Sequence, residues 1–167
     1  MDKRVNKDNY YLTIADAVLG RSTCLRRKYG AIIVKNDEIL STGYNGAPRG
    51  RINCNALGYC NREQLQIPAG QRYELCRSVH AEANAIISAA RRDMIGGTLY
   101  LVGRDAKTNQ LLTDTTSCAM CRRMIINSGI DRVVCRIGDS DIAEVSVQDW
   151  IEHDESIQPK AEKCDFC

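Results

Sequence analysis

Four residues have the types and spacing that a catalytic metal site requires: His80, Glu82, Cys118 and Cys121. His80 and Glu82 are two positions apart at the start of an apolar, alanine-rich segment, and the cysteines form a Cys-x-x-Cys pair. One imidazole and two thiolates supply three of the four ligands of tetrahedral Zn²⁺, and a fourth position left open is typical of catalytic sites. The sequence therefore predicts a zinc site made by His80, Cys118 and Cys121.

Glu82 is the carboxylate left outside this ligand set. Zinc lowers the pKa of a bound water to about 7, and Glu82 is then expected to take and return protons during the reaction. A structural interpretation competes with this one. In it, His80 is a polar residue that begins a helix, Glu82 is a carboxylate favoured by the helix dipole, and the two cysteines are buried thiols without a metal. The fixed offset between Glu82 and His80 favours the catalytic interpretation.

Length and composition limit the class of protein. The 167 residues, 44% hydrophobic and 26% charged, fit one globular domain. No segment approaches the roughly 18 apolar residues of a membrane helix, and the charged first residues lead into no export signal. A net charge of +2 and 5% aromatic residues do not favour nucleic-acid binding. Nine cysteines, an odd number, favour metal ligation in a reducing compartment, so we expect a cytoplasmic protein.

The elements that position these residues can be predicted from the apolar periodicity. Residues 9–19 carry a helical stripe, and residues 31–34 and 39–44 form a hairpin. The remaining helices and strands are expected at residues 80–92, 98–102, 120–127, 131–136 and 146–152. This order predicts an α/β fold in which helices cover a mixed sheet. Both metal-ligand groups begin helices, where the positive end of the dipole favours thiolates.

Three segments lie outside that regular order. Residues from about 51 to 77 are polar, lack periodicity and contain several cysteines, and a loop of this length is usually functional or fixed by a ligand. Residues 103–116 are expected to form a second hairpin-like excursion that turns at residues 107–110. A C-terminal tail starts at about residue 154 and contains Cys164 and Cys167, to which no role is assigned.

The order and spacing of several motifs resemble those of the deoxycytidylate (dCMP) deaminases, a branch of the cytidine deaminase superfamily. The pair of metal motifs matches the zinc deaminase signature, H-x-E followed by P-C-x-x-C, except that Ser117 stands in place of proline. Proline would stiffen the start of that helix, whereas Ser117 is expected to cap it. The motifs that carry the resemblance are Thr23–Arg27, Gly43–Pro48, Glu74–Arg77, His80–Glu82, Cys118–Cys121 and Ile125–Ile130.

The resemblance implies one deaminase domain over residues 1–167, with a cytidine-deaminase-like three-layer α/β/α fold around a mixed sheet of about five strands. It implies zinc-dependent hydrolytic deamination of dCMP to dUMP, a step that supplies thymidylate synthesis. It also implies a homo-oligomer, either a hexamer or a dimer, that dCTP activates and dTTP inhibits.

The resemblance also assigns residues around the substrate. Asn45 matches an asparagine that binds the deoxyribose, although an Asn-Gly pair is also a common turn. The backbone N–H of Ala81 is expected to orient the amine or carbonyl of the base. Arg91, late on the same predicted helix, matches a phosphate-binding arginine and fits a solvated helical residue equally well. Arg26 and Arg27 are further candidates for phosphate or effector contact.

Four more cysteines match positions that hold a second, structural zinc in some members of the family: Cys24, Cys54, Cys60 and Cys76. Four thiolates can close a tetrahedral site and fix a long loop. Single buried thiols are also common in protein cores. Asn53 stands where many relatives have histidine, so the ligand set is left open.

Two departures from the family leave the substrate open. A tyrosine that touches the phosphate in the family has no counterpart after residues 133–134, and Asp139 would repel a phosphate if it faced the substrate. One alternative is a zinc deaminase of another small amino-heterocycle, such as free cytidine, deoxycytidine or a modified nucleotide. The other is a non-catalytic, zinc-stabilised nucleotide-binding module. Glu82 argues against the second, because a structural zinc site needs no carboxylate beside its ligands.

Overall fold

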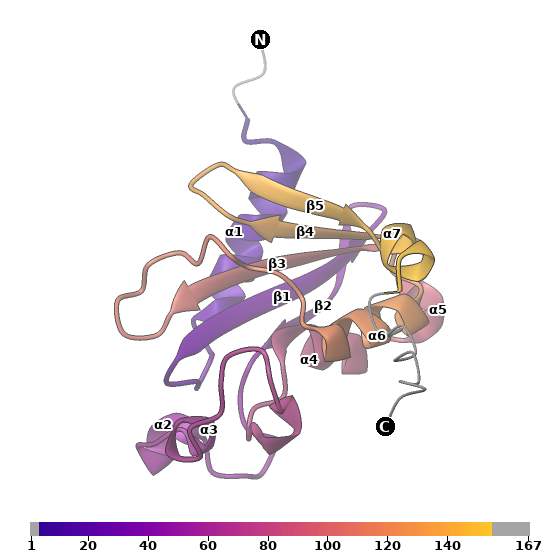
Figure 1. Cartoon of the computed structure of the whole chain (residues 1–167). Coiled ribbons are helices and arrows are strands. Elements are labelled where there is room, and N and C mark those ends of the chain that lie inside the picture. The colour runs from indigo at the N-terminus through magenta and orange to yellow at the C-terminus, as the bar shows by residue number, and fades with distance from the viewer. Residues whose placement is uncertain (1–3, 155–167) are drawn as a thin grey trace, which may run out of the picture.

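A mixed five-stranded sheet forms the centre of the molecule (Figure 1). The structure is a computed structural model and describes residues 4–154. The strand order is β2-β1-β3-β4-β5; only β3 and β4 run parallel, and the other neighbouring pairs are antiparallel. This confirms the predicted α/β class. The strands are β1 (Arg27–Lys35), β2 (Glu38–Tyr44), β3 (Thr98–Asp105), β4 (Arg132–Arg136) and β5 (Ile142–Ser146).

Helices cover both faces of this sheet, as the three-layer prediction requires. On one face, Leu12 and Ala15 of α1 (Lys7–Leu19) pack against Ile32 and other buried residues of the central strands. On the opposite face, Ile33 and its neighbours pack against α4 (Ala81–Ile87), α6 (Ala119–Ser128) and α7 (Val147–Glu152). Successive side chains of a strand point to opposite faces, so Ile32 and Ile33 belong to separate cores.

The N-terminal helix shows why the local sequence is helical. Asn6 is its N-cap, and the Asn6 side chain accepts a 2.8 Å hydrogen bond from the backbone N–H of Asn9. Gly20 is its C-cap. None of the helices in residues 4–154 is both long and apolar enough to cross a membrane.

The prediction of one helix from residue 80 to residue 92 is wrong in its extent. α4 ends at Ile87, and a separate helix, α5 (Arg91–Met94), begins after an extended Ala90. The Ser88 hydroxyl donates to the carbonyl of Asn84 (2.8 Å), and the Ser88 N–H donates to Ala85. These bonds satisfy the last carbonyls of α4 and allow the helix to end there.

The sequence also missed the edge strand β5, which pairs with β4 alone. It is only five residues long and alternates weakly in burial, so its pattern is too faint to predict. The excursion at residues 103–116 is confirmed, because the N–H of Leu112 donates to the carbonyl of Gly103 (2.9 Å). The predicted C-terminal tail, with Cys164 and Cys167, lies outside the described residues.

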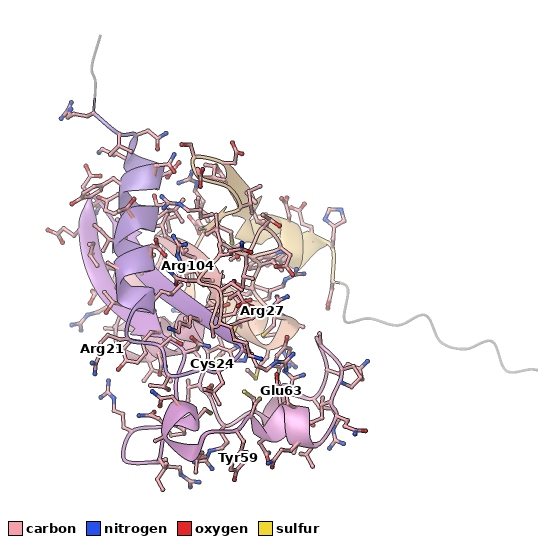
Figure 2. The ribbon with its side chains drawn as sticks, turned by 90° about the vertical axis from the view of Figure 1, so that its left-hand side faces the viewer. Arg21, Cys24, Arg27, Tyr59, Glu63 and Arg104 are labelled. Carbon is pink, nitrogen blue, oxygen red and sulfur yellow. The ribbon has the colours of Figure 1, made fainter. Side chains whose placement is uncertain are left out.

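The long segment at residues 51–77 is not entirely irregular. It contains α2 (Cys54–Leu57), α3 (Asn61–Gln64) and the 3-10 turn η1 (Tyr73–Leu75), each too short to leave a periodic pattern. Figure 2 shows this segment, with Tyr59 and Glu63, below Cys24 and Arg27 at the start of β1. The segment therefore covers one end of the sheet, next to the beginning of α4 (Figure 1).

Candidate active site

The N-termini of α4 and α6 lie side by side and bring the predicted zinc ligands together. His80 is the N-cap of α4, Cys118 is the N-cap of α6, and Cys121 lies within the first turn of α6. The Sγ atoms of both cysteines lie 3.4 Å from His80 Nδ1, and the three ligand atoms lie within 4.8 Å of one another. Ligand atoms around a tetrahedral zinc are about 3.6 Å apart at the usual Zn–S and Zn–N lengths, so these residues fit the ion.

The two thiols differ in how readily they ionise. Hydrogen bonding from Cys121 and from His80 lowers the pKa of Cys118 far below its ordinary value. The same thiol pair raises the pKa of Cys121, because its proton is shared with the Cys118 sulfur and because Cys121 is buried. A cation held here favours the thiolate form of both, as metal ligation requires.

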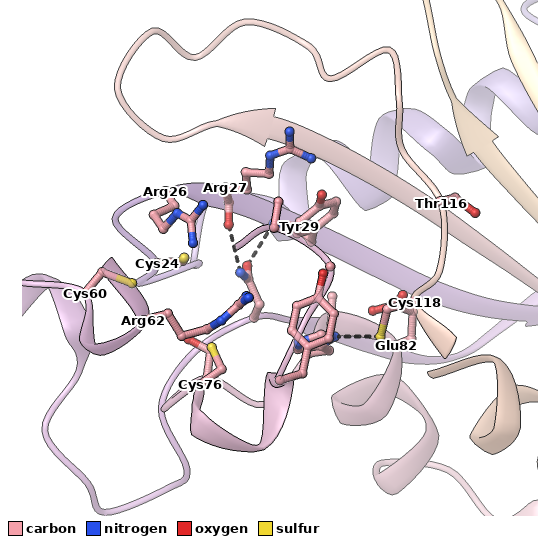
Figure 3. Close-up of a pocket in the computed structure, with 17 residues that line it drawn as sticks. Cys24, Arg26, Arg27, Tyr29, Cys60, Arg62, Cys76, Glu82, Thr116 and Cys118 are labelled. Atoms are coloured by element: carbon pink, nitrogen blue, oxygen red, sulfur yellow. Dashed lines mark hydrogen bonds between the residues drawn. The ribbon is translucent and has the colours of Figure 1, made fainter. Parts of the chain in front are cut away.

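Glu82 follows His80 in the first turn of α4 and is only 5% exposed. Figure 3 shows its carboxylate beside Cys118 in a common cavity. Burial raises the pKa of the Glu82 carboxyl above its ordinary value. A general acid/base must both accept and release protons near the working pH, and a raised carboxyl pKa suits that task.

Ser117 does not cap α6, and that prediction is wrong. Cys118 is the N-cap and makes no side-chain capping bond, while the Ser117 hydroxyl is buried without a hydrogen-bond partner. Ser117 is instead fixed through its backbone, because its carbonyl accepts a 3.0 Å hydrogen bond from Arg122 Nε. The entry to α6 is therefore fixed through the main chain.

The cavity has a volume of about 150 Å³ and two chemically different ends. Figure 3 shows Glu82, Cys118 and Thr116 at one end. Arg26 and Arg62 lie at the other end, with several cysteine thiols around them. One cavity thus joins the candidate zinc site to a cationic region.

Asn45 lines the cavity between these ends, where the sequence predicted a sugar contact. Its side chain is buried: Oδ1 accepts from the Tyr29 N–H (2.8 Å) and the Ser22 hydroxyl (2.6 Å), and Nδ2 donates to the Arg27 carbonyl (2.9 Å). These bonds join the loop after β2 to the start of β1. A side-chain amide has two N–H groups, so one remains for a ligand. Ala81, also predicted at the substrate, is buried and lines the cavity too.

The structure does not bring Arg91 to the cavity. Because α4 ends early, Arg91 lies exposed on α5, and its Nε donates to a backbone carbonyl of α6 (2.8 Å). Arg26 and Arg27 do line the cavity, but each is paired with a carboxylate. Arg26 Nε lies 3.2 Å from Glu63, and Arg27 Nη1 lies 3.1 Å from Asp114.

The four other cysteines are only partly brought together. Cys24, Cys60 and Cys76 line the cationic end of the cavity (Figure 3), whereas Cys54 is buried 4.0 Å from the Ser78 hydroxyl. Within residues 4–154, His80, Cys118 and Cys121 are the only group of three or more metal-binding side chains at ligating separations. A second, structural zinc at the four cysteines stays a prediction.

Arg62 and Tyr73 line the cavity and were not predicted from the sequence; the other unpredicted lining residues are Tyr29, Ala69, Gly70, Ser78 and Thr116. The Arg62 guanidinium carbon lies 4.6 Å from the centroid of the Tyr73 ring, and that ring lies 5.0 Å from the His80 ring in an edge-to-face arrangement. Both come from the aperiodic segment at residues 51–77. The position of Arg62 two residues after Cys60 was the one hint that the sequence contained.

Comparisons with known proteins agree with this geometry. Residues 5–137 match the family model of the cytidine and deoxycytidylate deaminase zinc-binding region. The deoxycytidylate deaminase of Mycobacterium phage D29 is 39% identical over 135 residues, which are 78% of this chain and 94% of the relative. The deoxycytidylate deaminase of Schizosaccharomyces pombe is 35% identical over 131 residues, 78% of this chain but 37% of the relative.

A solved structure is similar as well. The crystal structure of dCMP deaminase from the cyanophage S-TIM5 in apo form has 27% sequence identity and a TM-score of 0.53, and the match covers 77% of this chain and 81% of that chain. The chain thus spans nearly all of the Mycobacterium phage relative and just over a third of the yeast one. The family match includes His80, Glu82 and the Cys118–Cys121 pair. The resemblance is confirmed, and the chain belongs to the deoxycytidylate deaminase family of the zinc-binding cytidine and deoxycytidylate deaminases.

Proposed function

We propose that this protein is a zinc-dependent deaminase that hydrolyses dCMP to dUMP and ammonia, a step that supplies dUMP for thymidylate synthesis. The observation that carries the proposal is the convergence of His80, Cys118 and Cys121, the first two of which line the same cavity as the buried carboxylate of Glu82. Membership of the deoxycytidylate deaminase family supports a cytosine nucleotide as the substrate.

The residues of the cavity account for the proton transfers. His80, Cys118 and Cys121 would hold the zinc ion, which would supply Lewis acidity and bring the pKa of a water molecule to about 7. Glu82 accepts a proton from the attacking water and passes it to N3 of cytosine, which makes C4 more electrophilic. The oxygen of the water adds to C4. As the added hydroxyl becomes the carbonyl of uracil, Glu82 takes its proton and delivers it to the amine, the C–N bond breaks and ammonia leaves.

Assembly, regulation and location are further parts of this proposal. Residues 1–167 act as one deaminase domain in the cytoplasm, and the seven cysteines among residues 4–154 are free thiols, which suits a reducing compartment. The protein forms a homo-oligomer, a hexamer or a dimer, activated by dCTP and inhibited by dTTP. Family membership supports this assembly, as do exposed apolar side chains on the helical layer, such as Ile87 (74% exposed) and Ile151 (52%). Light scattering with and without each nucleotide tests the assembly.

Two alternatives make different predictions. A deaminase of free nucleosides needs no anion-binding end in its cavity, whereas this cavity ends in arginines. A non-catalytic nucleotide-binding module needs no buried carboxylate beside its zinc ligands, whereas Glu82 is held there. Asp139, predicted to repel a phosphate if it faced inward, is exposed between β4 and β5 and does not line the cavity.

The deciding experiment is ammonia release from purified, zinc-loaded protein supplied with dCMP, deoxycytidine, CMP, cytidine and dCTP in parallel. We expect the highest kcat/KM with dCMP. A higher kcat/KM with a nucleoside would support zinc-dependent deamination but would show that dCMP is not the preferred substrate. No turnover of any member of the panel by protein with a full zinc complement would favour the binding module.

A further inference from the structure

We infer that Arg62 binds the 5′-phosphate of the nucleotide and makes the site select a nucleoside monophosphate over the free nucleoside. The inference rests on the proposed function and assigns the cationic end of the cavity to one residue. Arg62 belongs to α3, in the segment at residues 51–77, and Figure 3 shows it at the end of the cavity opposite Glu82 and Cys118.

The charge of Arg62 is buried and forms no ion pair with a carboxylate in the described part of the chain. The residue is 6% exposed. Removing a charge from water without a counter-ion is unfavourable, and the neutral Tyr73 ring beneath the guanidinium carries no charge to balance it, so an anion bound here would be stabilised. The other cavity arginines are already compensated, since Arg26 pairs with Glu63 and Arg27 with Asp114.

The existing hydrogen bonds hold Arg62 in place without satisfying it. Its Nη2 donates to the carbonyls of Pro68 (2.8 Å) and Gln71 (2.5 Å), while its Nε is buried with no hydrogen-bond partner. Two carbonyls orient the guanidinium, but they carry no net charge to balance it. A guanidinium has five N–H donors in a planar fork, and a phosphate monoester accepts from such a fork bidentately.

The position of Arg62 suits the shape of a nucleotide. The Tyr73 ring separates it from the zinc end, with its centroid 4.6 Å from the Arg62 guanidinium carbon and 5.0 Å from the His80 ring. In a pyrimidine nucleotide the exocyclic amine and the 5′-phosphate are at opposite ends, with the deoxyribose between them. A base whose C4 faces Glu82 therefore directs its phosphate toward the arginine end, past Asn45.

The other candidates for this role are less suited to it. Arg91 lies exposed outside the cavity, and the phosphate-contacting tyrosine that the family places after β4 is missing from this sequence. Arg62 supplies a charged contact from a different element. The long segment at residues 51–77 then has a function, because its turns provide the carbonyls of Pro68 and Gln71 that orient Arg62.

The test compares Arg62→Gln and Arg62→Lys with a matched control, Arg72→Gln, which removes an exposed arginine from the same segment. For Arg62→Gln we expect kcat/KM with dCMP to fall about 100-fold, mainly through KM, while kcat/KM with deoxycytidine changes less than about threefold. Arg62→Lys restores part of the loss, because lysine supplies the charge without the bidentate fork. Arg72→Gln behaves as wild type. Equal losses with both substrates would overturn the inference and leave Arg62 a purely structural residue.

A binding measurement separates this inference from the proposed function. Inorganic phosphate and deoxyribose 5-phosphate, titrated calorimetrically into the zinc-loaded wild type, should bind, and Arg62→Gln should abolish the binding. A wild type that turns over no cytosine compound but binds phosphate through Arg62 would overturn the proposed function and keep this phosphate site. Equal phosphate affinity in wild type, Arg62→Gln and Arg62→Lys would overturn the assignment whatever the activity.

Discussion

Gly43 of β2 and Ala81 of α4 pack backbone against backbone. A Cβ added to Gly43 would lie 2.2 Å from the Ala81 carbonyl oxygen and 2.4 Å from the backbone nitrogen of Ala85. Ala81 stands between His80 and Glu82 in the sequence, so this contact sets the depth at which a metal ligand and the proposed acid/base lie in the cavity. A glycine is needed here because the neighbouring atoms belong to the main chain and cannot rotate away.

Replacing Gly43 should therefore disturb the site from a distance. Gly43→Ala is expected to lower the free energy of unfolding by about 1–3 kcal/mol, because the added methyl group forces β2 and α4 apart. It should also weaken zinc binding, since His80 moves with α4. Urea unfolding and zinc content measure the two effects. Thr42→Ala, at an exposed position of the same strand, is the control and should change stability by less than about 0.5 kcal/mol. Wild-type stability and zinc content in Gly43→Ala would contradict the packing described above.

Glu82→Gln should separate proton transfer from metal binding. The amide keeps the size of the side chain but cannot relay protons, so kcat should fall by about 10²–10⁴. Zinc content should stay at the wild-type level, because Glu82 is outside the ligand set. Glu152→Gln, which changes an exposed carboxylate at the end of α7, serves as the control. A Glu82→Gln variant with more than a tenth of the wild-type kcat would exclude Glu82 as the essential acid/base.

Cys121→Ala should remove one zinc equivalent per chain relative to wild type and abolish activity, because two ligands hold the ion poorly. Cys135→Ala is the matched control, since Cys135 is another buried thiol but lies in the core and outside the ligand group. Elemental analysis of dialysed protein gives the zinc content. Equal zinc loss in the two variants would indicate unfolding of the site, and retention of zinc in Cys121→Ala would remove Cys121 from the ligand set.

Acid stability should depend on the ion pair that joins α1 to β4. Both oxygens of Asp8 accept 2.9 Å hydrogen bonds from Arg132, and the Tyr100 hydroxyl donates to Asp8 at 2.8 Å. The bonds from Arg132 are the main reason that the pKa of Asp8 is lowered below 3.8. The stabilisation is therefore present above about pH 4, the pKa of an unfolded Asp, and is lost as the pH falls through the lower folded value.

Asp8→Asn tests this coupling. At pH 7 the substitution should lower the free energy of unfolding by about 1–2 kcal/mol, since Asp8 is partly exposed. The difference from wild type should shrink as the pH approaches 2, where the wild-type carboxylate is protonated as well. Asp93→Asn, which changes an exposed aspartate on α5, should show no such trend. Thermal unfolding between pH 2 and 7 gives both curves. A constant difference across that range would show that ionisation of Asp8 contributes nothing.

The sequence alone was enough to predict the fold class and to identify the residues of the candidate zinc site. His80, Glu82, Cys118 and Cys121 could be found because short spacings decide which side chains share a helix start, and strand periodicity decides which residues face a core. The hairpin and the strands β3 and β4 followed from equally local signals, whereas the edge strand β5 did not. The short helices were harder to predict. Only α7 was predicted as a helix of its own, whereas α2, α3 and α5 are four residues long and too short to show a period.

Only the tertiary structure decided which residues reach the cavity from outside these motifs. The sequence left Arg91 either a phosphate contact or a solvated helical residue. Because α4 ends at Ser88, Arg91 lies exposed on α5 and donates to a carbonyl of α6. Arg62 gave almost no signal, because its place over the Tyr73 ring depends on turns that supply the carbonyls of Pro68 and Gln71. Local spacing sets the chemistry of a helix start, whereas the direction of a side chain in an aperiodic segment is set by contacts between residues that are distant in the sequence.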